Sequence, residues 1–363
     1  MAILTVRNEA AFLLEWLAHH RAVGFTDFLV FSNDCQDGTD DMLDHLASLN
    51  HPASLDHPAS LDHPASLGQL THIRNDGPYD KGGIQFTALK QADRLDIVRA
   101  ADWILTLDID EFVNIHVGNH SLQALITALP EASAITLTWR QFGNDGIARY
   151  EDRPVRDIFT ACAPEIIHWP WRAAMFKTLY RNDATYGKPG VHRPRSPDKD
   201  RLAQARWFDC AGRELGDDFK TKRLYSDYGR PLFRLAQLNH YVLGSMESYL
   251  LKSDRGRVNH RDRMQLDYWV ERNYNTDRDT SIHQMAPQST PLLAALKADE
   301  TLARLHENAV TWRKGRFESL MLQDEFRALY TRLLMAPPSR PIDADTARTL
   351  AGYARKGQNT GKQ

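Results

Sequence analysis

Residues 101–112 read ADWILTLDIDEF, and this segment constrains the possible folds of the chain more than any other. Its apolar run, residues 104–107, predicts a strand that is covered on both faces, as in a parallel α/β sheet. Three carboxylates, Asp108, Asp110 and Glu111, follow directly. Ligands bind at the carboxyl ends of the strands in such sheets, so the segment predicts a binding site at that edge.

The spacing of the carboxylates indicates a metal site. Side chains alternate along a strand, so we expect Asp108 and Asp110 to point the same way and Ile109 the opposite way. Two such carboxylates repel each other unless a cation lies between them, and oxygen ligands favour a hard ion such as Mg²⁺ or Mn²⁺. Acidic residues after a strand also cap helices and solvate turns, so the D-x-D pattern alone leaves both interpretations open.

Charge and cysteine content exclude several classes of protein. The net charge of -2 over 363 residues gives no support to nucleic-acid binding. Basic residues gather between positions 188 and 206 and between 252 and 263, which suits an anionic ligand, although a solvated, salt-bridged surface is the simpler explanation for either stretch alone. Three widely spaced cysteines, Cys35, Cys162 and Cys210, indicate neither a disulfide framework nor a zinc site, and fit a reducing cytoplasm.

The chain shows no pattern for crossing a membrane. No stretch approaches about eighteen consecutive apolar residues, and the N-terminus lacks the basic, apolar and small-residue order of a signal peptide. We therefore expect a cytoplasmic protein whose membrane contact, if there is any, is peripheral.

A strand–helix–strand–helix order opens the chain. Residues 2–6 and 28–31 read as buried strands, and residues 9–22 carry apolar side chains at helical spacing. Parallel crossovers are right-handed, so the loops after these strands open on the same sheet edge as the loop after residue 107. Three polar loops are thus expected to converge there: residues 7–9, 33–37 and 108–111.

Between these loops lies an HPASLD repeat, residues 51–68. Each copy contains a proline, which removes a backbone donor and prevents a continuous helix, so we interpret the repeat as an expanded surface loop. A histidine-rich metal-binding tract is the alternative.

Further elements follow from residue patterns. We expect strands at 69–74 and 134–139, and helices at 83–100, 121–129, 249–252, 264–272, 292–310 and 317–334. Residues 140–227 have few periodic stretches and suit a variable substrate face. The polar tail after Pro337 is expected to be mobile.

Several segments in this order resemble a known family. TVRNEAAFLLEWLAHHRAVGF, FSNDCQDGTDDML, WILTLDIDEF, WRQFGNDG and LNHYVLGSMESYLLKSDRG are similar to bacterial glycosyltransferases of the family 2-like group, which are related to glycosyltransferase family 92. The resemblance implies a GT-A fold, a Rossmann-like α/β fold with a mostly parallel central sheet and a helical C-terminal region. Its parts would be a nucleotide-sugar-binding half (1–145), an acceptor half with a closing metal and diphosphate segment (146–275), C-terminal helices (276–336) and a tail (337–363).

The resemblance also implies roles for individual residues. Asp110 corresponds to the direct metal ligand, Asp108 to a ligand of metal or ribose, and His240 to a late histidine that completes metal or diphosphate binding. On its own, such a histidine is more often a satisfied core residue. The implied nucleotide-sugar contacts are Val6, Arg7, Glu9, Asn33, Asp37, Lys81, Gln85, Asp108, Lys252 and Arg255, with His192 as a further phosphate-side candidate. In this group, Lys252 and Arg255 would grip the diphosphate.

An inverting reaction needs a carboxylate that deprotonates the acceptor hydroxyl. Asp145 is the first candidate and Glu111 the second, although the N-D-G tripeptide around Asp145 is also an ordinary turn. The tryptophans that could stack on sugar rings are Trp139, Trp169, Trp171 and Trp207. Relatives usually have a serine-containing turn where this chain has Asp34-Cys35-Gln36, which puts contacts from Asp34 in doubt.

The resemblance thus implies a glycosyltransferase that depends on Mn²⁺ or Mg²⁺. It would move a sugar from a nucleotide-sugar donor to a glycan or glycolipid acceptor in cell-surface polysaccharide synthesis, in the cytoplasm or at the inner face of the membrane. Two alternatives stay open: a haloacid-dehalogenase-like phosphatase, whose paired aspartates also follow an apolar strand, and a non-catalytic carbohydrate-binding protein. The sugar, the acceptor, the stereochemical outcome and the oligomeric state are not predicted.

Overall fold

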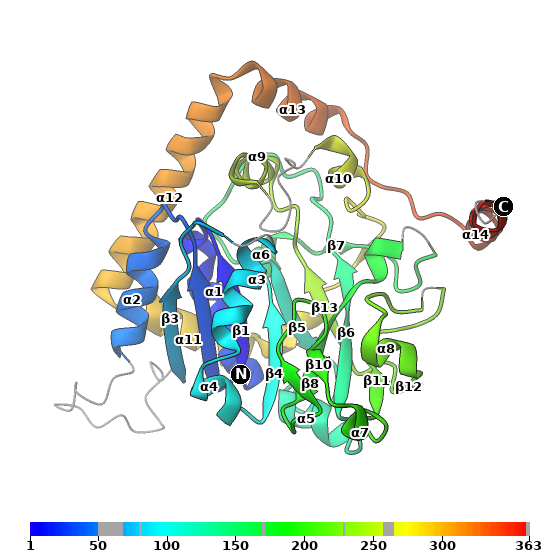
Figure 1. Ribbon diagram of the computed structural model, residues 1–363. Helices are drawn as coiled ribbons and strands as arrows, with labels where there is room; N and C mark the ends of the chain where they lie inside the picture. The colour runs from blue at the N-terminus through cyan, green and yellow to red at the C-terminus, as the bar shows by residue number, and fades with distance from the viewer. Residues whose placement is uncertain (50–67, 80–81, 169–170, 228, 257–264, 361–363) are drawn as a thin grey trace.

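The computed structural model describes residues 1–49, 68–79, 82–168, 171–227, 229–256 and 265–360. A large β-sheet runs through the centre of the protein and helices cover both of its faces (Figure 1). The HPASLD repeat falls outside the described residues, apart from Gly68 at its end.

The sheet is mixed but mostly parallel, with the strand order β12-β11-β6-β8-β4-β1-β2-β3. Parallel pairs join β1 (Ala2–Val6) to β2 (Asp27–Ser32) and β4 (Trp103–Leu107), and β2 to β3 (Gln69–Arg74). Antiparallel β8 (Phe176–Arg181) lies between β4 and β6 (Ala134–Gln141). β13 (Ala236–His240) pairs with β6 in parallel and with β5 (Glu111–Ile115) in antiparallel orientation. β11 (Trp207–Asp209) pairs with β6 and β12 (Glu214–Leu215).

Two small sheets involve the segment predicted to form a substrate face, residues 140–227, and the second of them also uses β14 (Asp277–Arg278) from beyond this segment. They pair β9 (Tyr186–Lys188) with β10 (Arg195–Pro197), and β7 (Ala161–Cys162) with β14. Apart from the six-residue strand β8, this segment consists mainly of short strands, short helices and turns, as its few periodic stretches predict.

The longer helices lie in the first 128 residues and after β13. Those of the first part are α1 (Ala10–Val23), α2 (Thr39–Leu49), α3 (Gly83–Ala92), α4 (Asp96–Ala100) and α5 (Leu122–Ala128). Short helices follow: α6 (Val155–Ile158), the 3₁₀ helix η1 (Trp171–Ala174), α7 (Lys199–Leu202) and α8 (Asp217–Thr221). The C-terminal part contains α9 (Met246–Arg255), α10 (Leu266–Val270), η2 (Ser281–Met285), α11 (Ala286–Ala298), α12 (Glu300–Met321), α13 (Asp324–Met335) and α14 (Ala344–Thr360).

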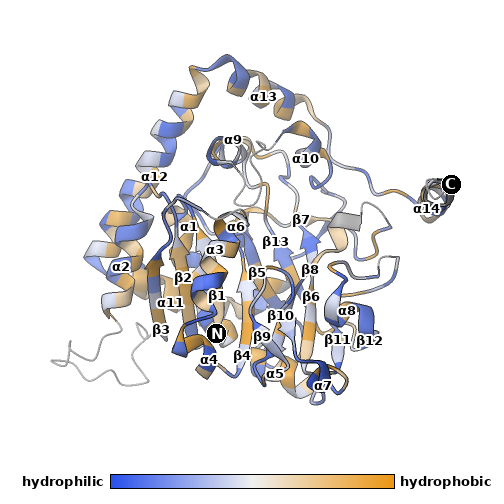
Figure 2. Ribbon diagram, viewed as in Figure 1, coloured by the Kyte–Doolittle hydropathy of each residue, from blue (hydrophilic) through white to orange (hydrophobic). Residues whose placement is uncertain are grey.

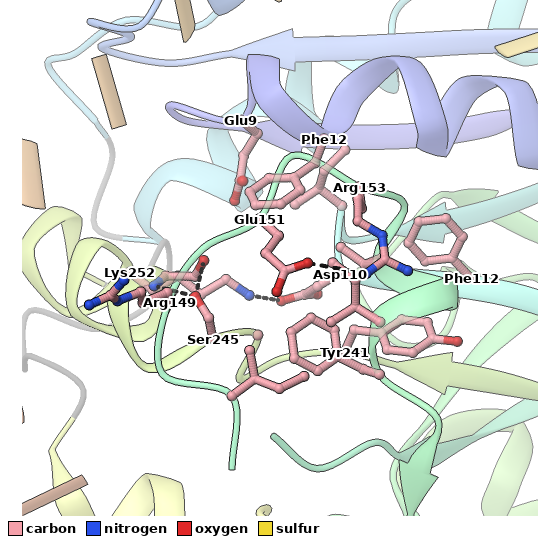
Figure 3. A pocket seen from close by; sticks show the side chains of 17 residues that line it. Glu9, Phe12, Asp110, Phe112, Arg149, Glu151, Arg153, Tyr241, Ser245 and Lys252 are labelled. Carbon is pink, nitrogen blue, oxygen red and sulfur yellow. Dashed lines mark hydrogen bonds and ion pairs between the residues drawn. The ribbon is translucent and has the colours of Figure 1, made fainter. Parts of the chain in front are cut away.

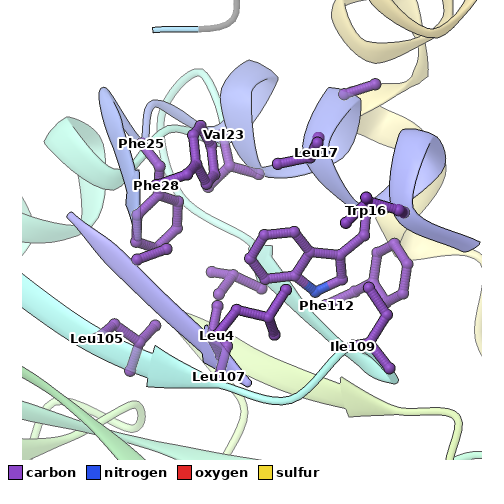
Figure 4. Packing of buried hydrophobic residues seen from close by; sticks show 14 of the residues in the cluster. Leu4, Trp16, Leu17, Val23, Phe25, Phe28, Leu105, Leu107, Ile109 and Phe112 are labelled. Carbon is purple, nitrogen blue, oxygen red and sulfur yellow. The ribbon is translucent and has the colours of Figure 1, made fainter. Parts of the chain in front are cut away.

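Alternating side chains of the strands feed two hydrophobic cores, one on each face of the sheet. On β1, Leu4 joins the core under α1 while Ile3 joins the core under α3. Figure 4 shows Trp16 of α1 packed among Leu4, Leu107 and Phe112. Figure 2 shows that the central strands are mostly hydrophobic, whereas the outer helices carry hydrophilic stretches. The prediction that the carboxylate strand is covered on both faces is confirmed.

Helix boundaries differ from the prediction in three places. The helix expected over residues 317–334 is divided between α12, which ends at Met321, and α13, which begins at Asp324. The helix expected over residues 83–100 is two helices, because α3 ends at Ala92 and α4 begins at Asp96. The helix expected over residues 292–310 is interrupted at Asp299, whose Oδ1 accepts a hydrogen bond from Leu302 N at 2.9 Å and caps α12. The tail expected to be mobile contains α14; its mobility stays a prediction.

The carboxylates do not continue the strand that precedes them. β4 ends at Leu107, residues 108–110 form a turn, and Glu111 begins β5. The predicted alternation of Asp108, Ile109 and Asp110 therefore does not hold, because it assumed extended backbone through Asp110. The turn instead directs the two aspartates to different partners, as described next.

Candidate functional site

The first two polar loops meet at the carboxyl ends of β1 and β2, as predicted. Gln36 N donates to Asn8 Oδ1 at 2.7 Å, and Asp37 Oδ2 accepts from Ala10 N at 3.0 Å. Asp37 Oδ1 accepts from the backbone and the hydroxyl of Thr39. Both oxygens of Asp37 thus cap backbone at the starts of α1 and α2, and its predicted contact with the nucleotide stays a prediction.

Asp108 and Glu111 share one buried cation. Lys177 Nζ, from β8, lies 2.9 Å from Asp108 Oδ2 and 3.6 Å from Glu111 Oε2. Gln85 Nε2 donates to Asp108 Oδ1 at 2.9 Å, and Trp139 Nε1 donates to Glu111 Oε1 at 2.6 Å. Burial raises the pKa of Glu111 well above its ordinary value. Burial alone would lower the pKa of Lys177, but the charges of Asp108 and Glu111 raise it.

Asp110 meets a second cation and a histidine. Lys252 Nζ, from α9, donates to Asp110 Oδ2 at 2.7 Å, and His240 Nε2 lies 3.7 Å from Oδ1. Burial alone would raise the pKa of Asp110, but the charges of Lys252 and His240 hold it below its ordinary value. Burial lowers the pKa of His240 to about 3, so its imidazole is neutral, and its ring lies against Trp139 with the centroids 4.1 Å apart. A neutral imidazole is the form that binds metal ions.

The end of α9 also contacts the first loop. Arg255 forms an ion pair with Glu9 and donates to the backbone oxygen of Arg7, while Arg7 Nη1 donates to the backbone oxygen of Arg255 at 3.2 Å. The two cations predicted to grip a diphosphate, Lys252 and Arg255, therefore lie between the first loop and the carboxylate turn. The sequence separates these groups by more than 140 residues, and α9 brings them together.

Some polar atoms at this edge have no hydrogen-bond partner among the described residues. Asn33 directly follows β2 and is fully buried, and neither its amide oxygen nor its amide nitrogen has such a partner. Nδ1 of His240 has no such partner either. Buried polar atoms are nearly always hydrogen-bonded in folded proteins, so these atoms are available for hydrogen bonds to a polar ligand. Val6, the remaining first-loop candidate, is buried at the end of β1.

Of the other predicted site residues, Asp145 and Trp207 lie apart from this group, whereas the ring of His192 lies beside it, with its centroid 5.7 Å from that of Trp139. The carboxylate of Asp145 accepts from Arg278 Nη1 at 2.9 Å and Nη2 at 3.3 Å. His192 Nδ1 is 3.0 Å from the backbone oxygen of Phe176, and burial lowers the pKa of its ring to about 4. Trp207 is a core residue of β11. Lys81, Trp169 and the side chain of Trp171 fall outside the described residues.

Sequence reasoning missed Lys177, the cation of the carboxylate turn. A signal was present, because Lys177 lies within the strand FKTLYR, whose first five residues are all buried. A fully buried lysine requires a carboxylate partner, but nothing local to β8 identifies that partner as Asp108, 69 residues earlier.

A cavity opens beside Asp110 (Figure 3). Apolar side chains line most of it: Phe12, Ile109, Phe112, Ile147, Val155, Ile158, Phe159 and Tyr241. Asp110, Lys252 and Glu9 form one polar wall, and Arg149, Glu151 and Arg153 add further charges. Residues 147–159 belong to the predicted acceptor half, so the cavity joins that half to the carboxylate turn.

Residues 1–200, more than half of the chain, match the family model described as Glycosyltransferase family 92. The chain belongs to glycosyltransferase family 92. The matched residues include β1 to β4, the carboxylate turn and Lys177, whereas His240, Lys252 and Arg255 lie beyond them. Membership supports glycosyltransferase activity for this family 92 chain.

One curated relative is a protein of Oryza sativa subsp. japonica named as a glycosyltransferase family 92 protein. It is 24% identical over 174 residues, which are 46% of this chain and 25% of the rice protein. The match thus spans about a quarter of that relative's length. Among solved structures, a UDP-glucose pyrophosphorylase complexed with UDP-glucose aligns with 81% of this family 92 chain and 98% of its own, at 7% identity and a TM-score of 0.26. A TM-score this low supports no conclusion about function.

Proposed function

We propose that this family 92 chain is a metal-dependent glycosyltransferase with a GT-A fold. It transfers a sugar from a nucleotide-sugar donor to a glycan or glycolipid acceptor, in the synthesis of a cell-surface polysaccharide. The observation that carries this proposal is the meeting of Asp110, His240 and Lys252 at the carboxyl edge of a mostly parallel sheet. Carboxylate, neutral imidazole and ammonium are the groups that a metal-bound diphosphate requires.

The residues present suit a Mn²⁺ or Mg²⁺ ion whose remaining ligands would come from the donor. Asp110 and His240 would hold the ion, and Asp108 is the further candidate. Among the described residues no group of three or more His, Cys, Asp or Glu side chains could hold a metal. Mg²⁺-type ions commonly use one or two carboxylates together with substrate phosphates, so a small set of protein ligands is sufficient. When bound, the ion would stabilise the negative charge of the departing nucleoside diphosphate.

The donor would lie across the ends of β1 and β2. Lys252 and Arg255 supply positive charge for its diphosphate, and the unpaired amide of Asn33 offers a donor and an acceptor for the base or ribose. Val6, Arg7 and Glu9 line the same edge, and Gln85 and Lys177 orient Asp108 there. The contacts of Lys81 and Asp37 with the nucleotide sugar stay predictions.

The acceptor would approach through the cavity beside Asp110, because residues of the acceptor half line it. The residue that would deprotonate the acceptor hydroxyl stays a prediction. Asp145 is held by Arg278 and does not line the cavity, and Glu111 is fully buried between Trp139 and Lys177, so the geometry favours neither strongly.

Location in the cytoplasm or at the inner face of the membrane also stays a prediction. No helix of the described chain combines the length and the apolar character that a membrane crossing needs.

A ligand screen tests the proposed function. UDP-, GDP-, ADP- and CMP-linked sugars are added with and without Mn²⁺, and thermal unfolding is followed, since a ligand that binds only the native state raises its stability. We expect one nucleotide class to raise the Tm, more strongly with Mn²⁺. Asp110→Ala should lose the Mn²⁺-dependent part and the transfer or hydrolysis of the donor, while Asp96→Ala, an exposed change on α4, should keep both.

Two results would separate the alternatives. Release of phosphate from simple phosphomonoesters, without donor turnover, would indicate the phosphatase. Sugar binding that is indifferent to metal and unaccompanied by turnover would indicate a non-catalytic protein. Full donor turnover by Asp110→Ala would overturn the metal-dependent mechanism.

A further inference from the structure

Arg313 of α12 is a buried cation without an acidic partner. Its side chain is almost fully buried, and its Nη2 donates to Ser248 Oγ at 3.0 Å. Its Nε has no hydrogen-bond partner, and within the described part of the chain no carboxylate forms an ion pair with it. A buried charge is costly unless it is paired, so this arginine needs an explanation beyond packing.

Three cations near Arg313 each have a carboxylate partner. Arg316 contacts both oxygens of Asp254 at 2.7–2.9 Å, Lys252 contacts Asp110, and Arg255 contacts Glu9. Arg313 instead lies over two aromatic rings, 4.5 Å from the centroid of Phe12 and 4.8 Å from that of Tyr150. Cation–π contacts offset part of the cost of burial, but they leave N–H donors of the guanidinium unused.

Arg313 lines a pocket between α9, α12 and the first loop, which we call the α9–α12 pocket. Asn8, Glu9, Lys252, Arg255, Arg313 and Arg316 form most of its charged and polar wall. Asp254 is its other carboxylate. Of its four cations, Lys252, Arg255 and Arg316 contact Asp110, Glu9 and Asp254, so the positive charge of Arg313 is the one left without a carboxylate contact among the described residues. Burial lowers the pKa of Arg313, and the more distant charges of Glu9 and Asp37 offset only part of this effect.

We propose that the α9–α12 pocket binds a phosphate group of the donor, and that Arg313 completes the site from α12. The inference rests on the proposed function and extends it, because it assigns a binding residue to the C-terminal helices, beyond the residues that match the family model. An Arg guanidinium can donate two parallel hydrogen bonds to a phosphate, which suits the unused donors of Arg313. The phosphate supplies the negative charge that the pocket lacks.

Replacing Arg313 should lower the affinity for the nucleoside diphosphate without lowering the stability of the ligand-free protein. Arg313→Met removes an unpaired buried charge but keeps an apolar side chain near the rings of Phe12 and Tyr150. The ligand-free variant should therefore unfold at the wild-type Tm or above it, while its Kd for the nucleoside diphosphate identified by the screen rises about 10- to 100-fold. Its affinity for the parent nucleoside, which has no phosphate, should not change.

Matched variants make the test specific. Lys314→Met removes the neighbouring charge, which is exposed on the same helix, and should change neither Tm nor Kd. Arg313→Lys keeps the positive charge but loses the two parallel donors of the guanidinium, so it should recover part of the affinity. An unchanged Kd in Arg313→Met, with a lower ligand-free Tm, would show a structural arginine and overturn the proposal; equal losses for nucleoside and nucleoside diphosphate would also overturn it.

Pyrophosphate separates failure of this inference from failure of the proposed function. If the wild type binds a nucleoside diphosphate and Arg313→Met binds it equally well, only the role of Arg313 fails. If the wild type binds no nucleoside diphosphate, the donor assignment fails. In that case, pyrophosphate binding that disappears in Arg313→Met would still support an anion pocket, and pyrophosphate binding that persists would overturn it.

Discussion

Lys252 Nζ lies 2.7 Å from Asp110 Oδ2, so a cation of the protein contacts the same carboxylate that we assign to a metal ion. His240 approaches the other oxygen of this carboxylate, at 3.7 Å from Oδ1. The ammonium group thus balances the charge of Asp110 when no other cation is present. A divalent ion bound at Asp110 would be repelled by it, unless a diphosphate lies between the two.

The first prediction follows from this repulsion. Lys252→Met should tighten the binding of Mn²⁺ to the nucleotide-free protein by about tenfold, because a positive charge next to the ion is removed. The same change should weaken the binding of the nucleoside diphosphate, which loses a cationic contact. Titration calorimetry measures both, with the exposed Lys188→Met as control. Mn²⁺ affinity that is unchanged or weaker in Lys252→Met would argue against a metal site at Asp110.

Removing Lys177 should destabilise the protein strongly. This lysine is fully buried and is the cation of both Asp108 and Glu111. Breaking a buried ion pair by removing one partner typically costs about 3–5 kcal/mol, since the remaining charge is left without compensation. Urea denaturation of Lys177→Met should therefore show a loss of about that size in the free energy of unfolding. A loss as small as that of Lys188→Met would mean that the carboxylates find other partners.

Local patterns were enough to predict much of the nucleotide half. Apolar runs and their flanking polar residues located β1, β2, β3 and β4, and the handedness of parallel crossovers placed their loops at one edge. Residues 69–74 were predicted as a strand and form β3. The resemblance of later segments pointed to His240, Lys252 and Arg255, which the structure brings to the same edge.

Partners that are distant in sequence could not be predicted. Strand β8 inserts antiparallel between β4 and β6, and this insertion delivers Lys177 to Asp108. Nothing in the residues around position 177 encodes that position in the sheet. Likewise, helices were predicted at residues 292–310 and 317–334, on either side of Arg313, but not that α12 continues through Arg313 or that Arg313 faces α9. The turn at residues 108–110 escaped prediction because a short polar stretch fits both an extended strand and a turn.

The role of Asp145 as a catalytic base can be tested directly. A general base contributes typically about 10²- to 10⁴-fold to the rate, so Asp145→Asn would lower kcat by that factor if the sequence-based assignment holds. The ion pair with Arg278, outside the cavity beside Asp110, leads us to expect a loss below about threefold. Arg278→Met is the companion variant, because it frees Asp145 without removing it. A loss of a hundredfold or more in Asp145→Asn alone would restore the assignment.

Glu15 should make stability depend on pH. It lies on α1 beneath the cavity wall, where its Oε2 accepts from Val155 N at 2.8 Å and Arg156 is its nearest cation. Burial raises the pKa of Glu15 from 4.5 to about 7. Between these two values the native protein binds more protons than the unfolded chain, so the contribution of Glu15 to the free energy of unfolding is lost as the pH rises.

Glu15→Gln has no proton to lose in this range. Relative to the wild type, its free energy of unfolding should therefore increase by about 2 to 3 kcal/mol between pH 5 and pH 8. Urea denaturation at pH 5, 6.5 and 8 measures the difference, with the exposed Glu307→Gln on α12 as reference. A difference between Glu15→Gln and the wild type that stays constant over this range would show that Arg156 keeps Glu15 ionised throughout. The carboxylate would then act as a permanent ion-pair partner that ties α1 to α6 beside the cavity.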